Sequence, residues 1–166
     1  NAQHTVLSEI RSDLGSGRPM NRLLQGDVGS GKTVIAGIAM AIVASRGAQA
    51  AIMAPTGILA DQHYQNIRAL FIRKKDTSSI FKEGEIRLLV GDTPETEKQE
   101  IRNGLISGEI KLIIGTHALL EEPVSFHNLQ LAVIDEQHRF GVEQRAILRQ
   151  KGQNPHLLVM TATPIP

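Results

Sequence analysis

The stretch from Gly26 to Thr33, Gly-Asp-Val-Gly-Ser-Gly-Lys-Thr, places the strongest constraint on what this chain can fold into. It matches G-x-x-x-x-G-K-[ST], the pattern of a loop that binds phosphate between a strand and a helix. Its glycines allow a sharp turn that brings backbone N–H groups close to phosphate oxygens. Lys32 can reach the β- and γ-phosphates, and the Thr33 hydroxyl can bind Mg²⁺. We therefore predict that this phosphate loop binds a nucleotide through Gly26, Asp27, Val28, Gly29, Ser30, Gly31, Lys32 and Thr33.

The sequence on either side of the phosphate loop fits this interpretation. Residues 22–25 are predicted to form a short strand, and residues 34–44 a buried helix whose N-terminus faces the phosphates. The alternative is a glycine-rich turn that matches the pattern by chance. A strand before the loop and a helix after it make that alternative much the weaker one.

Short apolar segments alternate with helical patterns along the whole chain. Predicted strands cover residues 22–25, 50–54, 86–90, 112–114, 131–134 and 157–160, and predicted helices cover residues 2–14, 34–44, 59–71, 95–106 and 142–150. This alternation is typical of an α/β fold, with a mostly parallel sheet and helices on both faces. The length of 166 residues suits one domain.

Composition removes several other classes of protein. The chain has no cysteine, which excludes disulfides and thiolate metal sites, and its six histidines show no metal-ligand spacing, so Mg²⁺ is the only metal that we expect. With a net charge of +1, binding to nucleic acid would depend on local groups. The longest apolar run, residues 34–44, is shorter than the about 20 residues needed to span a bilayer, so no membrane partner is expected. Because the chain begins at Asn1 and ends in Thr-Pro-Ile-Pro, we expect a piece of a longer protein.

The pair Asp135-Glu136 follows four apolar residues at the end of a predicted strand. Ligands of parallel sheets bind beyond the carboxyl ends of the strands, so this pair should lie on the same edge as the phosphate loop. Asp135 can hold Mg²⁺ together with Thr33, and Glu136 can polarise the attacking water. An acidic pair by itself more often begins a surface turn, but about a hundred residues after a phosphate loop it predicts a nucleotide hydrolase.

Four segments resemble motifs of the superfamily 2 helicases and translocases. They are residues 54–60, Gly115-Thr116-His117, Asp135-Glu136-Gln137-His138 and Thr161-Ala162-Thr163. The longer strings at residues 25–33, 137–142 and 160–166 resemble the RecG family of bacterial branch-migrating DNA helicases, and the resemblance runs from end to end. The related transcription-repair coupling factor family, Mfd, usually carries Asp-Glu-Glu-His where this chain has Gln137.

The resemblance implies a RecA-like P-loop NTPase domain over residues 1–166, the first motor domain of an ATP-dependent DNA helicase. It implies ATP and Mg²⁺ as cofactors and branched or duplex DNA as the partner. A wedge domain and a second motor domain would belong to the same parent chain, a monomer in the bacterial cytoplasm associated with the nucleoid. The fragment alone is then expected to hydrolyse ATP very slowly and to unwind nothing, because a charge-stabilising arginine worth about 10³–10⁵ in rate would come from the second motor domain.

The resemblance also assigns roles beside the nucleotide. Gln3 would read adenine, and the alternative is an exposed helix residue. Gln137 and His138 would act with Lys32 and Glu136 in catalysis by linking the γ-phosphate to the DNA site. For His138 the alternative is a buried histidine with satisfied hydrogen bonds.

Further residues would couple this site to DNA. Thr161 and Thr163 would carry the coupling, unless their hydroxyls only cap a turn at the strand end. Four residues would line the DNA track, where hydroxyls and loop N–H groups bind phosphates without reading sequence: Pro55, Thr56, Thr116 and His117. The alternative for these four is that they are ordinary loop residues.

One residue departs from the family pattern, and one charged cluster has two interpretations. Gly57 stands where this family has a glutamate, and it should make the loop around it more flexible. The basic cluster at residues 73–75 is more often a solvated face than a DNA contact.

Three other classes of nucleotide-binding protein fit the sequence less well. A small-molecule kinase would need a lid and an acceptor pocket, and neither is legible. A GTPase would carry Asn-Lys-x-Asp, which the sequence lacks. An ATP-regulated binding module without hydrolysis would not need a general base at Glu136.

Overall fold

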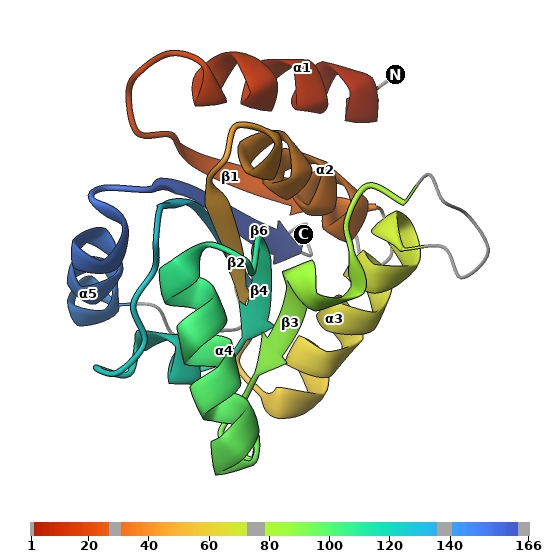
Figure 1. The fold of residues 1–166 in the computed structure, drawn as a ribbon. Coiled ribbons are helices and arrows are strands. Elements are labelled where there is room, and N and C mark those ends of the chain that lie inside the picture. Colours follow the sequence, from red (N-terminus) through yellow and green to blue (C-terminus); the bar gives the residue numbers. More distant parts are fainter. Residues whose placement is uncertain (1, 27–30, 73–78, 136–140, 163–166) are drawn as a thin grey trace.

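The computed structural model describes residues 2–26, 31–72, 79–135 and 141–162. The strands in Figure 1 are β1 (Asn21–Gly26), β2 (Gln49–Met53), β3 (Ile86–Leu89), β4 (Leu112–Gly115), β5 (Leu129–Asp135) and β6 (His156–Ala162). The helices are α1 (Ala2–Leu14), α2 (Lys32–Ser45), α3 (Gly57–Phe71), α4 (Glu95–Ser107) and α5 (Val142–Gly152), with short 3-10 turns η1 (Glu83–Glu85) and η2 (His117–Leu120). Every predicted strand and helix is present, with its ends displaced by at most two residues.

All the strands run parallel in one sheet, in the order β1-β6-β5-β2-β4-β3. The predicted α/β fold with a parallel sheet is therefore confirmed. Strand β6, the last in the described sequence, lies between β1 and β5. One strand, β6, thus separates β1, which leads into the phosphate loop, from β5, which ends at Asp135.

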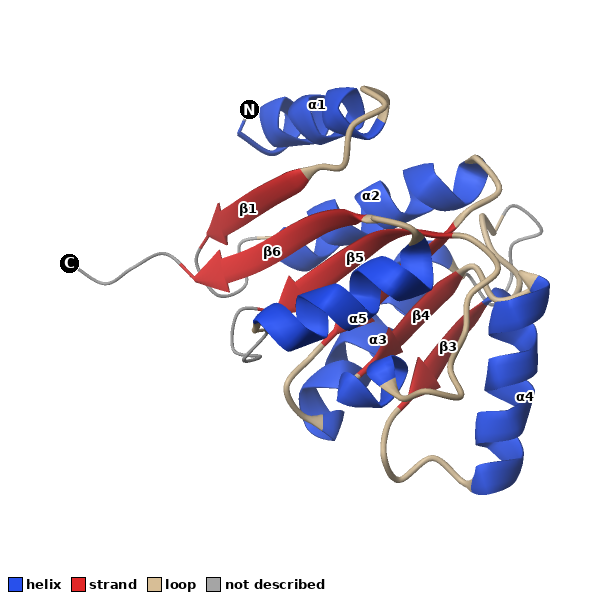
Figure 2. Cartoon of the chain, turned by 90° about the vertical axis from the view of Figure 1, so that its left-hand side faces the viewer, coloured by secondary structure: helices blue, strands red, loops and turns tan. Residues whose placement is uncertain are grey.

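The core has two layers, one on each face of the sheet. Successive residues of β2 point to opposite faces, so Ala50 and Ile52 join the layer under α1, α2 and α3, while Ala51 and Met53 join the layer under α4 and α5. All residues of the central strand β2 are buried, which explains its apolar run at residues 50–53. Its first residue, Gln49, is a buried polar residue whose amide donates to the Leu105 and Ile110 carbonyl oxygens. Figure 2 shows the helices flanking the parallel strands.

Helices α2 and α3 pack closely at Gly37. A Cβ added there would lie 2.9 Å from Leu70 Cδ2 and 3.0 Å from Ile67 Cδ1, so this contact leaves no room for a side chain. Since α2 begins at the phosphate loop, the close contact fixes α3 relative to the nucleotide-binding end of the sheet.

Candidate functional site

The carboxyl ends of three adjoining strands form one edge of the site. In the register of the sheet, Gly26 of β1 pairs with Ala162 of β6, and Asp135 of β5 pairs with Met160 of β6. Two strand spacings, about 10 Å, separate β1 from β5 across the sheet, so Gly26 and Asp135 lie at neighbouring strand ends on this edge. The two predicted nucleotide elements therefore meet at the same edge, as their positions after apolar strands indicated.

Lys32 begins helix α2 and reaches across to β6. Its Nζ donates a hydrogen bond to the Thr161 carbonyl oxygen at 3.0 Å. The residue before it, Gly31, has a φ of 89°, which favours glycine, and none of the described side chains caps the helix there. The first N–H groups of α2 can therefore bind an anion.

Gln3 lies against the end of the phosphate loop. A Cβ added to Gly31 would come within 2.3 Å of the Gln3 Nε2 atom, so the amide occupies the space that a larger residue would fill. The structure thus brings Gln3 beside Gly31, which directly precedes Lys32, although α1 is remote from this loop in sequence. Its reading of adenine stays a prediction.

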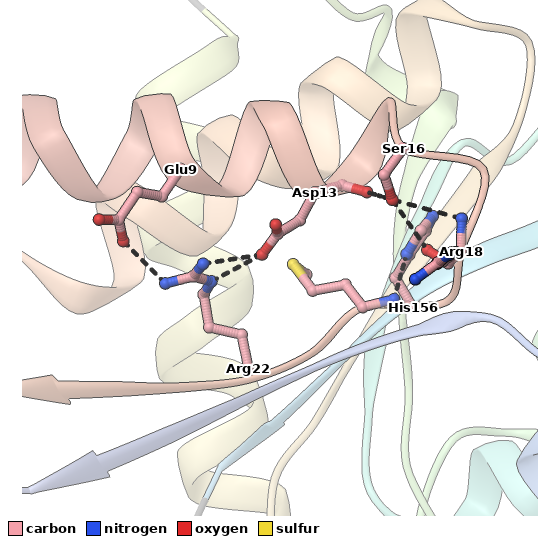
Figure 3. A network of polar contacts seen from close by, with 7 residues as sticks. Glu9, Asp13, Ser16, Arg18, Arg22 and His156 are labelled. Atoms are coloured by element: carbon pink, nitrogen blue, oxygen red, sulfur yellow. Dashed lines mark hydrogen bonds and ion pairs between the residues drawn. The ribbon is translucent and has the colours of Figure 1, made fainter.

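A polar network holds α1, and with it Gln3, in place (Figure 3). The Arg22 guanidinium on β1 lies 2.8 Å from the Glu9 carboxylate and 2.8 Å from the Asp13 carboxylate, both on α1. The hydrogen bond that the guanidinium donates to the Asp13 carboxylate is the main cause of the raised pKa of Arg22. This network joins the helix that carries Gln3 to the strand that leads into the phosphate loop.

The connection from α1 to β1 is also tied to β6. The Met20 backbone N–H donates to His156 Nδ1 at 2.7 Å. Burial lowers the pKa of His156, the positive charge of Arg46 lowers it further, and Asp13 opposes both effects. A neutral ring is the form that can accept this hydrogen bond through Nδ1.

Asp135 is mostly buried and contacts helix α3. Its Oδ2 lies 3.1 Å from His63 Nε2, and the two side chains are 17% and 12% exposed. Sequence reasoning gave His63 no role and missed this contact. The available signal was a polar residue between apolar positions Leu59 and Ile67.

Several predicted site residues lie outside the described residues. In the phosphate loop these are Asp27, Val28, Gly29 and Ser30, and after β5 and β6 they are Glu136, Gln137, His138 and Thr163. The basic cluster at residues 73–75 lies outside them as well. Their assigned roles stay predictions.

The predicted DNA-track residues follow two neighbouring strands. Met53 of β2 pairs with Gly115 of β4, so Pro55 and Thr56 lie near Thr116 and His117 at the same edge of the sheet. Thr56 is exposed and caps α3 by accepting a hydrogen bond from the Leu59 N–H at 3.2 Å. Thr116 is only 5% exposed and accepts from the Ala118 N–H at 3.3 Å, so its hydroxyl has a structural role. His117 is exposed.

Gly57 lies in a helix rather than in a flexible loop, which corrects the expectation from sequence. It is the first residue of α3, directly after its N-cap Thr56, and an added Cβ would meet nothing within 4 Å. Sequence reasoning missed this because the predicted helix began two residues too late.

Replacing Gly57 with glutamate is expected to stabilise the chain by about 1 kcal/mol. A helical glycine costs about 0.5–1 kcal/mol relative to alanine, and a carboxylate in the first turn interacts favourably with the helix dipole. The melting temperature should rise by about 2–4 °C in thermal unfolding. Gly57→Lys, which removes the glycine but adds the opposite charge, should gain less. A lower melting temperature for both variants would contradict this prediction.

A cleft of about 460 Å³ lies beside the start of α2, within the size range of small-molecule sites. It is lined by Gly31, Lys32, Thr33, Val34, Asn66, Ala69 and Leu70. A larger hollow of about 790 Å³ lies near the start of β5. It is lined by the segment that precedes this strand and by the end of α5. We assign the nucleotide to the phosphate-loop edge, because the larger hollow holds none of the predicted nucleotide-binding residues.

The residues at this edge fit a magnesium nucleotide. The hydroxyl of Thr33 and the carboxylate of Asp135 are the hard oxygen ligands that Mg²⁺ prefers. Within the described residues no group of three or more His, Cys, Asp or Glu is placed to hold a metal without a nucleotide, and no helix is long and apolar enough to cross a membrane. The fold and site together define a P-loop nucleotide-binding domain of the RecA-like class.

The chain belongs to the DEAD/DEAH box helicase family, whose family model matches residues 1–166. It is 52% identical over 165 residues to the ATP-dependent DNA helicase RecG of Streptococcus pneumoniae, covering 99% of this chain and 23% of that protein. The RecG of Thermotoga maritima is 52% identical over 166 residues, covering 100% of this chain and 20% of the relative. A solved structure of RecG bound to a three-way DNA junction matches with a TM-score of 0.83 and 46% identity, covering 100% of this chain and 21% of that one.

These comparisons confirm the resemblance to RecG and the RecA-like fold. The chain spans about a fifth of the length of the curated relatives that it matches. The activities of the whole relatives are therefore only proposed for this chain.

Proposed function

We propose that the chain is the first motor domain of a RecG-like, ATP-dependent DNA helicase that remodels branched DNA. The observation that carries this proposal is the hydrogen bond from Lys32 to the end of β6, the strand that pairs with β5 at Asp135. The ends of β2 and β4, where the predicted DNA residues lie, are at the same edge of the sheet. The names of the relatives, and the three-way junction in the matching structure, support DNA as the partner.

The chain's own residues divide the work at the nucleotide. Lys32 and the first N–H groups of α2 hold the phosphates, and Gln3 recognises adenine. Thr33 and Asp135 would hold Mg²⁺, which would neutralise negative charge on the bound phosphates. Glu136 accepts a proton from the attacking water. Gln137 and His138 link the presence of the γ-phosphate to the DNA-binding site.

The same proposal extends to the rest of the protein. A second motor domain and a wedge domain would lie elsewhere in the parent chain, which would work as a monomer in the bacterial cytoplasm beside the nucleoid. Pro55, Thr56 and His117 would contact the DNA backbone, while the buried Thr116 would hold the turn that carries His117. Thr161 and Thr163 would pass the nucleotide state to the DNA. The net charge of +1 agrees with contacts that are local to this edge.

The test is ATP hydrolysis by the full-length protein with no nucleic acid, linear duplex DNA, a forked junction or RNA. We expect the fork to stimulate hydrolysis most strongly. Equal stimulation by linear duplex would replace branch specificity with plain translocation along DNA. The absence of stimulation by every nucleic acid would remove the helicase proposal and leave a P-loop ATPase.

Replacing Glu136 with glutamine is expected to lower kcat for ATP hydrolysis by about 10²–10⁴-fold, the usual contribution of general base catalysis. ATP affinity should stay close to that of the wild type, because the phosphate contacts of Lys32 remain. Rates are measured in the full-length protein, and affinity with a fluorescent ATP analogue. Glu109→Gln, an exposed residue remote from this edge, is the matched control. Unchanged turnover in Glu136→Gln would remove the residue from its role.

A further inference from the structure

We propose that His63 is a positioning residue for the Asp135 carboxylate and that it couples helix α3 to the nucleotide site. The inference rests on the proposed function, because it takes Asp135 as a residue that holds the magnesium nucleotide. His63 lies outside the segments that resemble the family motifs. The inference comes from a contact between two elements that are 72 residues apart.

The geometry indicates how the ring is used. His63 Nε2 lies 3.1 Å from Asp135 Oδ2, and among the described residues His63 Nδ1 is buried without a hydrogen-bond partner. A proton on Nε2 donates to the carboxylate and leaves Nδ1 as an unprotonated acceptor. The opposite tautomer would bury an unpaired N–H and turn a lone pair toward the carboxylate, which is costly. We therefore assign the donor role to Nε2.

The contact fixes the orientation of the carboxylate. The terminal torsion of aspartate is broad, so an unsupported carboxylate samples many orientations. The hydrogen bond from His63 to Oδ2 restrains the direction in which the carboxylate faces a bound cation. Hydrogen-bonding partners of metal ligands typically change metal affinity by about 10–100-fold when they are removed.

The position of His63 on α3 gives the contact a second consequence. Thr56 caps the start of this helix at the predicted DNA edge, and His63 lies about 10 Å further along the axis. Asn66, nearly one turn beyond His63, lines the cleft that also contains Lys32 and Thr33. Helix α3 therefore contacts the predicted DNA edge at its start and both nucleotide elements along its side. A displacement of α3 by DNA would move the group that orients Asp135.

The experiment compares His63→Leu, which removes the donor, with His63→Gln, whose amide nitrogen can replace Nε2. Both are made in the full-length protein, with Gln65→Ala, an exposed residue on the same helix, as the control. The first readout is the Mg²⁺ concentration that gives half-maximal binding of a fluorescent ADP without DNA. The second is the ratio of DNA-stimulated to basal ATP hydrolysis.

For His63→Leu we expect the half-maximal Mg²⁺ concentration to rise by about 10–100-fold. Binding of the fluorescent ADP in EDTA should stay unchanged, and stimulation by DNA should fall. His63→Gln should restore most of both responses. Wild-type Mg²⁺ dependence in a folded His63→Leu protein would overturn the proposal, as would a folded His63→Gln protein as impaired as the leucine variant.

If His63→Leu does not fold, His63→Asn replaces it, because its shorter amide cannot reach Asp135 from α3. An asparagine variant that behaves like the glutamine variant would then overturn the proposal. Asp135→Asn separates this inference from the proposed function. If the wild type and Asp135→Asn bind the nucleotide with the same Mg²⁺ dependence, the assignment of Asp135 fails, and the role of His63 fails with it. If only Asp135→Asn differs from the wild type, the role of His63 alone fails.

Discussion

Replacing Lys32 with alanine is expected to lower ATP hydrolysis by the full-length protein about 10²–10³-fold, the usual loss when one donor to a developing charge is removed. Lys32 is the first residue of α2, at the point where the phosphate loop continues into this helix. Its ammonium group has three donors, of which one is on the Thr161 carbonyl in this structure. Two donors are therefore left for phosphate oxygens. The measurement is steady-state hydrolysis with saturating forked DNA.

The control for this variant is Lys98→Ala, which removes a lysine from α4 on the other face of the sheet. Lys98→Ala should leave the rate unchanged. A loss of rate in Lys32→Ala would then come from the position of Lys32 and not from the removal of one positive charge. The melting temperature of Lys32→Ala should stay near that of the wild type, because Lys32 is only partly buried. Hydrolysis at the wild-type rate would exclude Lys32 from the nucleotide site, and with it the central observation behind the proposed function.

Replacing Gly115 with alanine is expected to destabilise the chain by about 3 kcal/mol, the cost of forcing an extra carbon into a filled core. An added Cβ would lie 2.2 Å from the Leu89 carbonyl oxygen on β3 and 3.0 Å from Leu119 Cγ. The Leu89 oxygen belongs to the backbone of the neighbouring strand, so it can move only if β3 moves. The melting temperature should fall by about 6–12 °C.

Gly57→Ala is the matched control for this variant, because the same added carbon there meets open space. It should leave stability unchanged or raise it. The comparison bears on function, since Gly115 lies in a segment that resembles a DNA-contacting motif. We expect Gly115→Ala to lose activity together with stability. A variant with the wild-type melting temperature but without DNA stimulation would instead assign Gly115 to the DNA surface.

The sheet order explains why Thr161 lies close to the phosphate loop. Because β6 separates β1 from β5, the end of β6 lies between Lys32 and Asp135. The hydrogen bond from Lys32 therefore ends on the strand that carries the Thr-Ala-Thr segment. This arrangement is consistent with the predicted coupling role of Thr161.

The sequence by itself determined the local structure and the class of site. The alternation of apolar strands with helical patterns predicted every strand and helix, because each element has its own periodicity. The phosphate loop and the Asp135-Glu136 pair predicted the same edge, because ligands of parallel sheets bind at the carboxyl ends of strands. The predicted start of α3 was wrong by two residues because Gly57 was taken as a loop residue.

Only the tertiary structure decided how these elements meet. Three features join residues that are far apart in the chain. They are the position of β6 between β1 and β5, the amide of Gln3 against Gly31, and the contact between His63 and Asp135. Local periodicity carries no information about which strands become neighbours or which helix faces touch. Those choices follow from how the two faces of the sheet bury their apolar side chains together.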